Sequence, residues 1–251
     1  MDILSSLQMV PINRLHLHEG HEPHRLEETA RAIEAEGVLC HPPLAYRMAG
    51  GDYLILDGAH RTGSLGLLGC RHVPVQVVRR DQFCWEAWDH VVERGPWLKD
   101  LLQDPALHPV EGEDPGNDAT LCVVDEEGRH LRIEPAEGSS RLEVWHRVVR
   151  AYRDIPVRRC PPDPDSIPPA GFVLIRHPQP STRFLEQTVK RGGVLPAGVT
   201  RCLVEGRLLN LRIPLQLLHA PTVDKQEWEH LKHRWAGRMR HYTESVYLCE
   251  A

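Results

Sequence analysis

The segment from residue 55 to residue 69, Ile-Leu-Asp-Gly-Ala-His-Arg-Thr-Gly-Ser-Leu-Gly-Leu-Leu-Gly, constrains the fold of this chain more than any other. The apolar residues before Asp57 predict a strand, and the Asp57-Gly58 pair ends it. Residues 62–68 predict a short helix that ends at Gly69. A strand, a glycine turn and a helix are therefore expected in direct succession.

The turn in this segment has the composition of a phosphate-binding corner. Gly58 allows the backbone to turn sharply and to approach a ligand closely. The amide groups at the start of a helix attract anions, and the planar guanidinium of Arg61 matches phosphate oxygens. From the residues alone, a strand–turn–helix corner with a salt-bridged arginine is an equally good interpretation.

Two other segments contain residue types that suit chemistry. In residues 16–22, His-Leu-His-Glu-Gly-His-Glu, Glu19 follows a predicted strand and could serve as a general base or in a magnesium site. An isolated loop glutamate is more often only solvated. In residues 195–201, Leu-Pro-Ala-Gly-Val-Thr-Arg, Thr200 and Arg201 could bind a carboxylate or phosphate. The plain alternative is a loop that enters a hairpin.

The pattern of apolar residues predicts an α+β chain with three regions, residues 1–80, 81–170 and 171–251. In the first region we expect a helix that begins at Pro23 and ends at Gly37, and strands at 10–17, 44–47, 53–56 and 73–78. Pro74 places the last of these at a sheet edge or at its own start.

The second and third regions are less regular in their pattern. In the second we expect helical stretches at 82–103 and 140–153, a polar loop at 104–118, a hairpin at 120–134 and a proline-rich linker or surface loop at 160–169. In the third we expect a strand at 172–175, a helix capped by Ser181 or Thr182, and a hairpin at 200–213 that turns at Glu205-Gly206. The final helix carries one apolar stripe made of Trp228, Leu231, Trp235 and Met239, which indicates core or dimer contact.

Composition narrows the class of protein. The seven cysteines are scattered and form no C-x-x-C pair, which favours a reducing, cytoplasmic setting over disulfides or structural zinc. A formal charge of −5 does not favour DNA as a partner. No apolar run has the length of a membrane span, and the first residues lack the pattern of a signal peptide, so we expect no membrane partner. The oligomeric state stays open, with a dimer as one option.

Taken together in their order, these segments resemble the ParB-like free L-serine kinases, which have a ParB/sulfiredoxin-type fold. The resemblance runs from Val-Pro-Ile-Asn-Arg (10–14) to Arg-His-Tyr-Thr-Glu-Ser-Val-Tyr-Leu (240–248), and includes Gly-Arg-Leu-Leu-Asn-Leu-Arg-Ile-Pro-Leu (206–215). It is closest to the branch linked to staphyloferrin B-type siderophore biosynthesis. It implies a mixed-sheet N-terminal domain, a smaller C-terminal α/β portion that closes the site, and transfer of the γ-phosphate of ATP to L-serine. ADP is the alternative donor.

The resemblance also implies roles for individual residues. Glu19 would accept the proton of the serine hydroxyl, and Asp57 would organise the reacting groups or a Mg²⁺ ion, whose ligands the sequence does not assign. The residues implied for the nucleotide phosphates are Gly58, His60, Arg61 and Thr62. The residues implied for serine are Thr200, Arg201 and Trp97. The product, O-phospho-L-serine, would supply diaminopropionate synthesis for a siderophore, and we expect the serine site where the two portions meet.

Departures from the family and rival interpretations bear on this hypothesis. Archaeal members carry a histidine at the place of Ala59 and a lysine near Gly198, and sulfiredoxin chemistry needs a cysteine where Ala59 stands. A ParB-type partition protein should carry a helix-turn-helix and a basic face after the phosphate motif, whereas residues 109–118 here are acidic and broken by prolines. The main alternative is a regulator that senses a nucleotide or another ligand.

Overall fold

The structure is a computed structural model that describes residues 3–112 and 121–242, and the chain forms two compact units. The first unit comprises residues 1–16, 23–82 and 204–251, and the second comprises residues 17–22 and 83–203. The boundary expected at residue 80 lies close to the crossing at 82–83, whereas the boundary expected near 170 falls inside the second unit. Residues 204–251 belong with the N-terminal elements, which a division by position along the chain does not anticipate.

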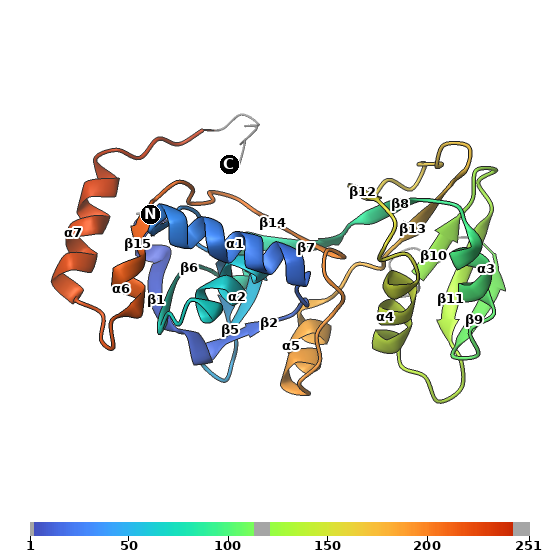
Figure 1. Cartoon of the computed structure of the whole chain (residues 1–251), viewed down its shortest axis with the longest axis horizontal. Coiled ribbons are helices and arrows are strands. Elements are labelled where there is room, and N and C mark those ends of the chain that lie inside the picture. The colour runs from blue at the N-terminus through green and yellow to red at the C-terminus, as the bar shows by residue number, and fades with distance from the viewer. Residues whose placement is uncertain (1–2, 113–120, 243–251) are drawn as a thin grey trace. The chain divides into compact units, whose positions relative to one another are not determined.

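The first unit is built on a mixed five-stranded sheet in the order β1-β6-β4-β5-β2 (Figure 1). β4 and β6 run parallel, and the β1–β6 and β4–β5 pairs are antiparallel. The strands are β1 (Leu7–Pro11), β2 (Leu15–Leu17), β4 (Leu44–Arg47), β5 (Tyr53–Asp57) and β6 (His72–Val78). The single strand expected at 10–17 is wrong in detail, because a 3₁₀ turn, η2 (Ile12–Arg14), divides it.

Helices α1 (Pro23–Glu36) and α2 (Ala59–Leu67) pack against each other in this unit (Figure 1). The Ser64 hydroxyl of α2 is fully buried and donates to the carbonyl of Leu26 in α1 at 2.9 Å. Helix α1 begins at Pro23 and is followed by Gly37 at φ 65°, as the sequence predicts. Helix α2 begins three residues earlier than expected, directly after Gly58.

Strand β6 is an interior strand, so of the two predicted placements for Pro74 the sheet edge is wrong, and the residue lies near the start of the strand. The residue pairs with Met9 of β1 on one side, and the register of β6 with β4 begins only at Gln76. Because Pro74 precedes the parallel pairing, its missing amide hydrogen leaves no ladder bond unmade on that side.

The remaining described elements of the first unit come from both its N-terminal and its C-terminal stretches. Asp224 caps the last helix by accepting from the amides of Gln226 and Glu227, and Trp228 and Leu231 are buried. Met239 lies beyond the end of that helix and is 39% exposed, so the predicted stripe ends earlier than expected. These elements are η1 (Ile3–Ser6), β3 (Val38–Leu39), η3 (Arg80–Gln82), β15 (Ile213–Pro214), α6 (Leu215–His219) and α7 (Lys225–Ala236).

The second unit is built on an antiparallel six-stranded sheet in the order β12-β8-β13-β10-β11-β9. Val91, Cys122, Val124 and Leu174 form one buried cluster on this sheet. The strands are β8 (Asp89–Glu93), β9 (Leu107–Glu111), β10 (Leu121–Val124), β11 (His130–Pro135), β12 (Val157–Cys160) and β13 (Phe172–Arg176). The hairpin predicted at 120–134 is confirmed as β10–β11.

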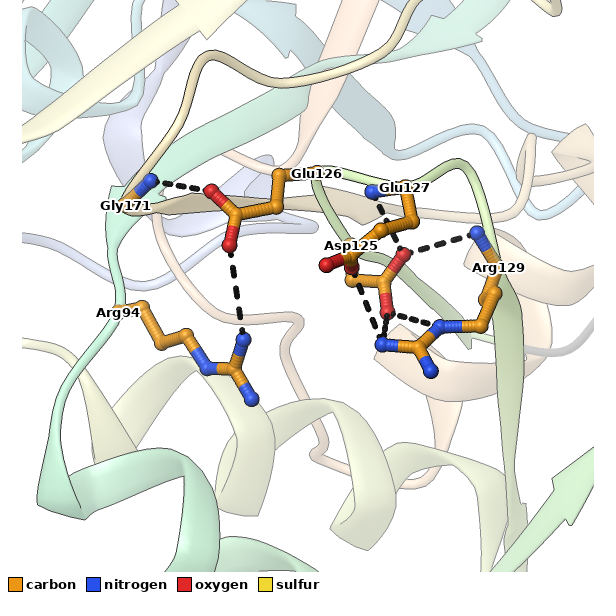
Figure 2. A network of polar contacts seen from close by, with 6 residues as sticks. All are labelled: Arg94, Asp125, Glu126, Glu127, Arg129 and Gly171. Carbon is orange, nitrogen blue, oxygen red and sulfur yellow. Dashed lines mark hydrogen bonds and ion pairs between the residues drawn. The ribbon is translucent and has the colours of Figure 1, made fainter.

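Side chains fix the turn of this hairpin, as Figure 2 shows. Asp125 accepts from the backbone amides of Glu127 and Arg129 and from the Arg129 guanidinium at 2.7–3.0 Å. Glu126 accepts from the amide of Gly171 at 2.6 Å and lies 4.0 Å from Arg94. An Asp at the start of a turn satisfies backbone donors in this way.

Helices of the second unit are α3 (Pro96–Leu102), α4 (Arg141–Ala151) and α5 (Thr182–Lys190), and Ser181 caps the last by accepting from the amide of Phe184. The helix expected at 82–103 is wrong in its first half, where β7 (Phe83–Ala87) and β8 stand. The alternating burial of β7 is a strand pattern.

Two further expectations for connecting segments have clear outcomes. The loop expected at 104–118 contains β9, and its residues 113–118 lie outside the described residues, as do residues 243–248 of the resembling C-terminal segment. The proline-rich segment 160–169 is a surface loop within the second unit, pinned by the Arg176 guanidinium, which donates to the carbonyls of Asp163, Pro164 and Ser166.

The hairpin expected at 200–213 is wrong. Strand β14 (Thr200–Val204) pairs with β7, and β15 pairs with β3, so the two strands do not pair with each other. Glycine at 206, with φ 69°, is the turn residue that suggested a hairpin, but the chain there leads into an irregular loop. No helix among the described residues is long and apolar enough to cross a membrane.

Candidate active site

The predicted phosphate-binding corner lies in the first unit, at the junction of β5 and α2. Gly58 has a φ of 94° and forms the N-cap of α2 without any side-chain cap. A Cβ atom at this position would lie 3.0 Å from Pro43 Cβ and 3.1 Å from Arg61 Nη2. Glycine is therefore required for both the backbone angle and the space, and helix α2 begins directly after it, where helix-start amides suit an anion.

Asp57 lies between two guanidinium groups of this corner. Arg61 Nη2 donates to Asp57 Oδ2 at 2.7 Å, and Arg207 Nη2 donates to the same oxygen. Arg61 Nη1 also donates to the carbonyl of His41 at 2.8 Å. Burial opposes ionisation of Asp57 most strongly, but the two arginines together outweigh it and hold the pKa of this carboxyl below its ordinary value. The carboxylate is thus charged at neutral pH.

The other two predicted phosphate ligands lie in the first turn of α2. His60 is half-buried there. Thr62 is 4% exposed, and its hydroxyl donates to the carbonyl of Gly58 at 2.9 Å. Since that proton is used within the helix start, Thr62 supports the glycine turn and does not itself donate to a ligand in this arrangement.

Sequence reasoning missed Arg207 and the residue that fixes it. The buried Gln76 side chain of β6 donates to the carbonyl of Gly206 and accepts from the amide of Leu208, both at 2.8 Å. The peptide groups on both sides of Arg207 are therefore held by one carboxamide. A buried glutamine in an apolar strand, His-Val-Pro-Val-Gln-Val-Val, is the signal that could have drawn attention to this region.

Glu19 lies in the second unit and is held by three donors from the 195–201 segment. Its Oε1 accepts from the Thr200 amide at 2.6 Å and from the Thr200 hydroxyl, and its Oε2 accepts from the Gly198 amide at 3.1 Å. Backbone bonds between Gly20 and Leu195 and between Leu195 and His18, at 2.8 and 2.7 Å, join the two segments. The structure therefore brings together Glu19 and Thr200, which lie far apart in the sequence.

His18 extends this arrangement. Its Nε2 lies 2.7 Å from the Thr200 hydroxyl oxygen, and its ring packs edge-on against Trp85. The side chain is buried. A line of polar contacts thus runs from the imidazole through the hydroxyl to the carboxylate.

A second group of buried side chains, around His90, contacts the backbone of Gly198. His90 Nε2 lies 2.9 Å from the carbonyl of Gly198, and His90 Nδ1 lies 2.9 Å from the hydroxyl of Tyr152. The His177 ring lies edge-to-face against the His90 ring, with ring centroids 4.5 Å apart. Burial lowers the pKa of His90 to about 4 and that of His177 well below its ordinary value, so both imidazoles are neutral.

The remaining two predicted serine ligands have other partners in the second unit. Arg201 Nη1 donates to Glu86 Oε2 at 3.0 Å, and the guanidinium lies over the Trp88 ring at 4.7 Å. Trp97 is buried against Tyr152, and its indole N–H donates to the carbonyl of Glu93 at 2.9 Å. Trp97 therefore supports the Tyr152–His90 group.

Asp57 is the side chain of the corner that could bind a magnesium ion. Within the described residues, no group of three or more His, Cys, Asp or Glu side chains is arranged to hold a metal ion. Asp57 Oδ1 accepts no hydrogen bond in residues 3–112 and 121–242. Mg²⁺ commonly binds through one or two carboxylates plus substrate phosphates, and this corner fits that manner of binding.

The fold is α+β, and its glycine corner with two arginines on one carboxylate has the composition of an anion-binding site. No family model matches the sequence. The chain is 36% identical over 248 residues to the ATP-dependent L-serine kinase SbnI of Staphylococcus aureus (strain NCTC 8325 / PS 47), which covers 97% of each protein. We conclude that the chain belongs to the family of L-serine kinases that SbnI represents.

Solved structures agree with this assignment. SbnI of S. aureus with a C-terminal truncation superimposes with a TM-score of 0.80 at 32% identity, covering 94% of this chain and 98% of that one. A variant of free serine kinase in complex with ADP gives a TM-score of 0.70 at 22% identity, with 84% and 93% covered, and this similarity concerns the fold. The α+β fold expected from the sequence is confirmed.

Proposed function

We propose that this protein is an ATP-dependent L-serine kinase that transfers the γ-phosphate of ATP to the hydroxyl of free L-serine and releases O-phospho-L-serine. The observation that carries the proposal is the 36% identity, over 97% of both chains, to a kinase of that description. The geometry of Glu19 and of the Asp57 corner supports it.

Glu19 is the proposed base. In the transfer, the serine oxygen forms a bond to the γ-phosphorus, the bond from that phosphorus to the bridging oxygen of ADP breaks, and the serine proton passes to a carboxylate. Glu19 Oε1 already accepts two hydrogen bonds, whereas Oε2 accepts one, from Gly198. Oε2 is therefore the proposed proton acceptor.

The β5–α2 corner is proposed to bind the nucleotide phosphates. The amides at the start of α2 and the Arg61 guanidinium supply donors and positive charge, and Asp57 orients Arg61. His60 is proposed to contribute from the first turn of α2, and Thr62 to hold the Gly58 turn. In phosphoryl transfer, this positioning and neutralisation of charge is the main contribution of the protein.

The serine contacts are proposed from the second unit. Thr200 orients the carboxylate of Glu19, and Arg201 is suited to the carboxylate of serine because Glu86 and Trp88 fix its plane. Trp97 supports these groups through Tyr152. Bound Mg²⁺ would neutralise phosphate charge, with Asp57 Oδ1 as its protein ligand. Supply of a siderophore pathway stays a prediction, ADP stays the alternative donor, a dimer stays one option for the oligomeric state, and DNA stays a partner that the sequence does not favour.

The test is direct observation of the product. Purified full chain is incubated with L-serine, Mg²⁺ and either ATP or ADP, and O-phosphoserine is measured by mass spectrometry. Asp57→Asn is compared with Asp52→Asn, because Asp52 also pairs with an arginine, Arg14, but lies away from the corner sequence. Product with ATP, with a loss of activity in Asp57→Asn alone, is expected. Folded, nucleotide-binding protein that forms no product with either donor would overturn the proposal.

A further inference from the structure

Two arginines share one carboxylate at the phosphate-binding corner, and the sequence motif accounts for only one of them. Arg61 belongs to the Asp-Gly-Ala-His-Arg turn, whereas Arg207 comes from a loop 150 residues after Asp57 in the sequence. One carboxylate against two guanidinium groups leaves a net charge of +1 in this cluster. An ion pair between Asp57 and Arg61 alone would have been neutral, so Arg207 supplies the excess positive charge.

The donors of Arg207 are not all used. Its Nη2 binds Asp57, while its buried Nε has no hydrogen-bond partner within residues 3–112 and 121–242. A buried donor without an acceptor is costly, and a guanidinium has five donors in one plane. The side chain as a whole is 30% exposed, although its Nε is buried. An anion that reaches the exposed part of this side chain would match the net positive charge of the cluster.

The loop that carries Arg207 is held in one conformation. Gln76 binds the peptide groups on both sides of Arg207, and the Leu211 amide donates to the carbonyl of Cys40 at 2.8 Å. Asn210 and Arg212 have φ angles of 55° and 53°, which residues other than glycine rarely adopt. Such unfavourable backbone persists where surrounding contacts determine it, and it is common at ligand sites.

We infer that Arg207 is a second phosphate-binding arginine of the corner, which contacts the polyphosphate chain of the nucleotide, and that Gln76 is its positioning residue. The inference rests on the proposed function for the identity of the ligand as an adenine nucleotide. A polyphosphate suits the corner because each guanidinium can pair with two phosphate oxygens, and a longer chain offers oxygens to both arginines.

The experiment measures the binding of adenosine, AMP, ADP and ATP to the full chain by calorimetry, in the presence of Mg²⁺. The variants are Arg207→Gln, Arg207→Lys and Gln76→Met, and the control is Arg212→Gln in the same loop. Arg212 is exposed and lies 3.8 Å from Glu36, away from Asp57. The thermal unfolding of each ligand-free variant is recorded to detect loss of folding.

We expect Arg207→Gln to weaken ATP and ADP binding by about tenfold or more, which corresponds to about 1.4 kcal/mol. Adenosine binding should stay within about twofold of the wild-type value, because the change concerns phosphate contacts alone. Arg207→Lys should be intermediate, since it keeps the charge and loses the planar donors. Gln76→Met should also weaken ATP binding more than adenosine binding, because Arg207 loses the side chain that positions it. Arg212→Gln should bind all four ligands as the wild type does.

Each outcome bears on the inference separately from the proposed function. Unchanged ATP affinity in Arg207→Gln overturns the inference, and the proposed function stands if serine is still phosphorylated. Equal losses for adenosine and ATP also overturn it, because they show a purely structural role. A selective loss of polyphosphate affinity in a protein that forms no O-phosphoserine supports the inference and overturns the proposed function. A wild type that binds no adenine nucleotide overturns both.

Discussion

The Thr200 hydroxyl donates its proton to Glu19 Oε1, the same oxygen that the Thr200 backbone amide binds at 2.6 Å. A hydroxyl has one proton, so the nearby His18 Nε2, at 2.7 Å, must carry a hydrogen and donate to the Thr200 oxygen. The order of donation is therefore from His18 to Thr200 to Glu19. This order fixes one carboxylate oxygen and leaves Oε2 with a free acceptor position.

The first prediction concerns this hydroxyl. Thr200→Val keeps the shape of the side chain and removes the hydrogen bonds to His18 and Glu19. We expect kcat for serine phosphorylation to fall by about tenfold or more, and the free energy of unfolding to fall by about 1–3 kcal/mol, because two polar groups lose a partner. Thr200→Ser restores the hydroxyl and should recover most of the activity. Equal activity in the Val and Ser variants would contradict the assigned role.

The second prediction concerns the base itself. Glu19→Gln keeps an oxygen for the Thr200 amide but cannot accept a proton, so kcat should fall by about 10²–10⁴-fold while ATP affinity stays within about twofold. The matched control is Glu22→Gln, whose carboxylate pairs with Arg159 at 3.0 Å and is not assigned to the chemistry. Steady-state kinetics for both variants decides the matter. A smaller loss of kcat in Glu19→Gln than in Glu22→Gln would contradict the assignment of Glu19 as the base.

The third prediction compares two glycines with similar backbone angles. Gly58 and Gly69 have φ angles of 94° and 72°, but a Cβ would contact Pro43 and Arg61 at Gly58 and nothing within 4 Å at Gly69. Gly69→Ala should cost only the backbone term, about 1 kcal/mol, and leave ATP binding unchanged. Gly58→Ala should cost more and weaken ATP binding by at least tenfold. Urea unfolding and calorimetry measure both, and equal effects of the two substitutions would speak against a phosphate role for the turn.

The sequence predicted those elements whose structure depends on residues only a few positions apart. The β5–α2 corner, α1, the β10–β11 hairpin and the Ser181 cap all follow from periodicity, glycine and capping residues within a few positions. The pairing of β14 did not, because Gly206 marks a turn whether or not the strands on either side of it pair.

The site was predicted in part for the same reason. The residues of its motifs could be recognised from the sequence. The contacts that determine the role of each residue join segments that lie far apart in the sequence. Glu19 and Thr200 are 181 residues apart, and Asp57 and Arg207 are 150 apart. Only the folded chain shows that Thr62 is buried within the helix start and that Arg207 joins Arg61 on one carboxylate.

The fourth prediction concerns pH. His90 Nε2 faces the carbonyl of Gly198 and His177 Nδ1 faces that of Trp88, so that nitrogen carries a hydrogen in each ring. Burial lowers the pKa of His90 to about 4 and lowers that of His177 well below 6.5, the ordinary value at which both titrate when unfolded. Below pH 6.5 the unfolded chain therefore binds protons that the folded chain does not. The free energy of unfolding should fall as pH falls from about 6.5 towards 4, by up to about 1.4 kcal/mol per pH unit for each histidine.

The comparison that isolates this effect is His90→Gln, whose amide can donate to Gly198 and accept from Tyr152 but does not titrate. Urea unfolding is followed by tryptophan fluorescence at pH 7.5, 6.0 and 5.0 in the wild type and the variant. The variant is less stable than the wild type at pH 7.5 if its packing is poorer, but its stability should decline less steeply below pH 6.5, by the contribution of one histidine. Parallel curves for the two proteins would show that His90 carries the same number of protons folded and unfolded, and would contradict the neutral, buried arrangement behind Gly198.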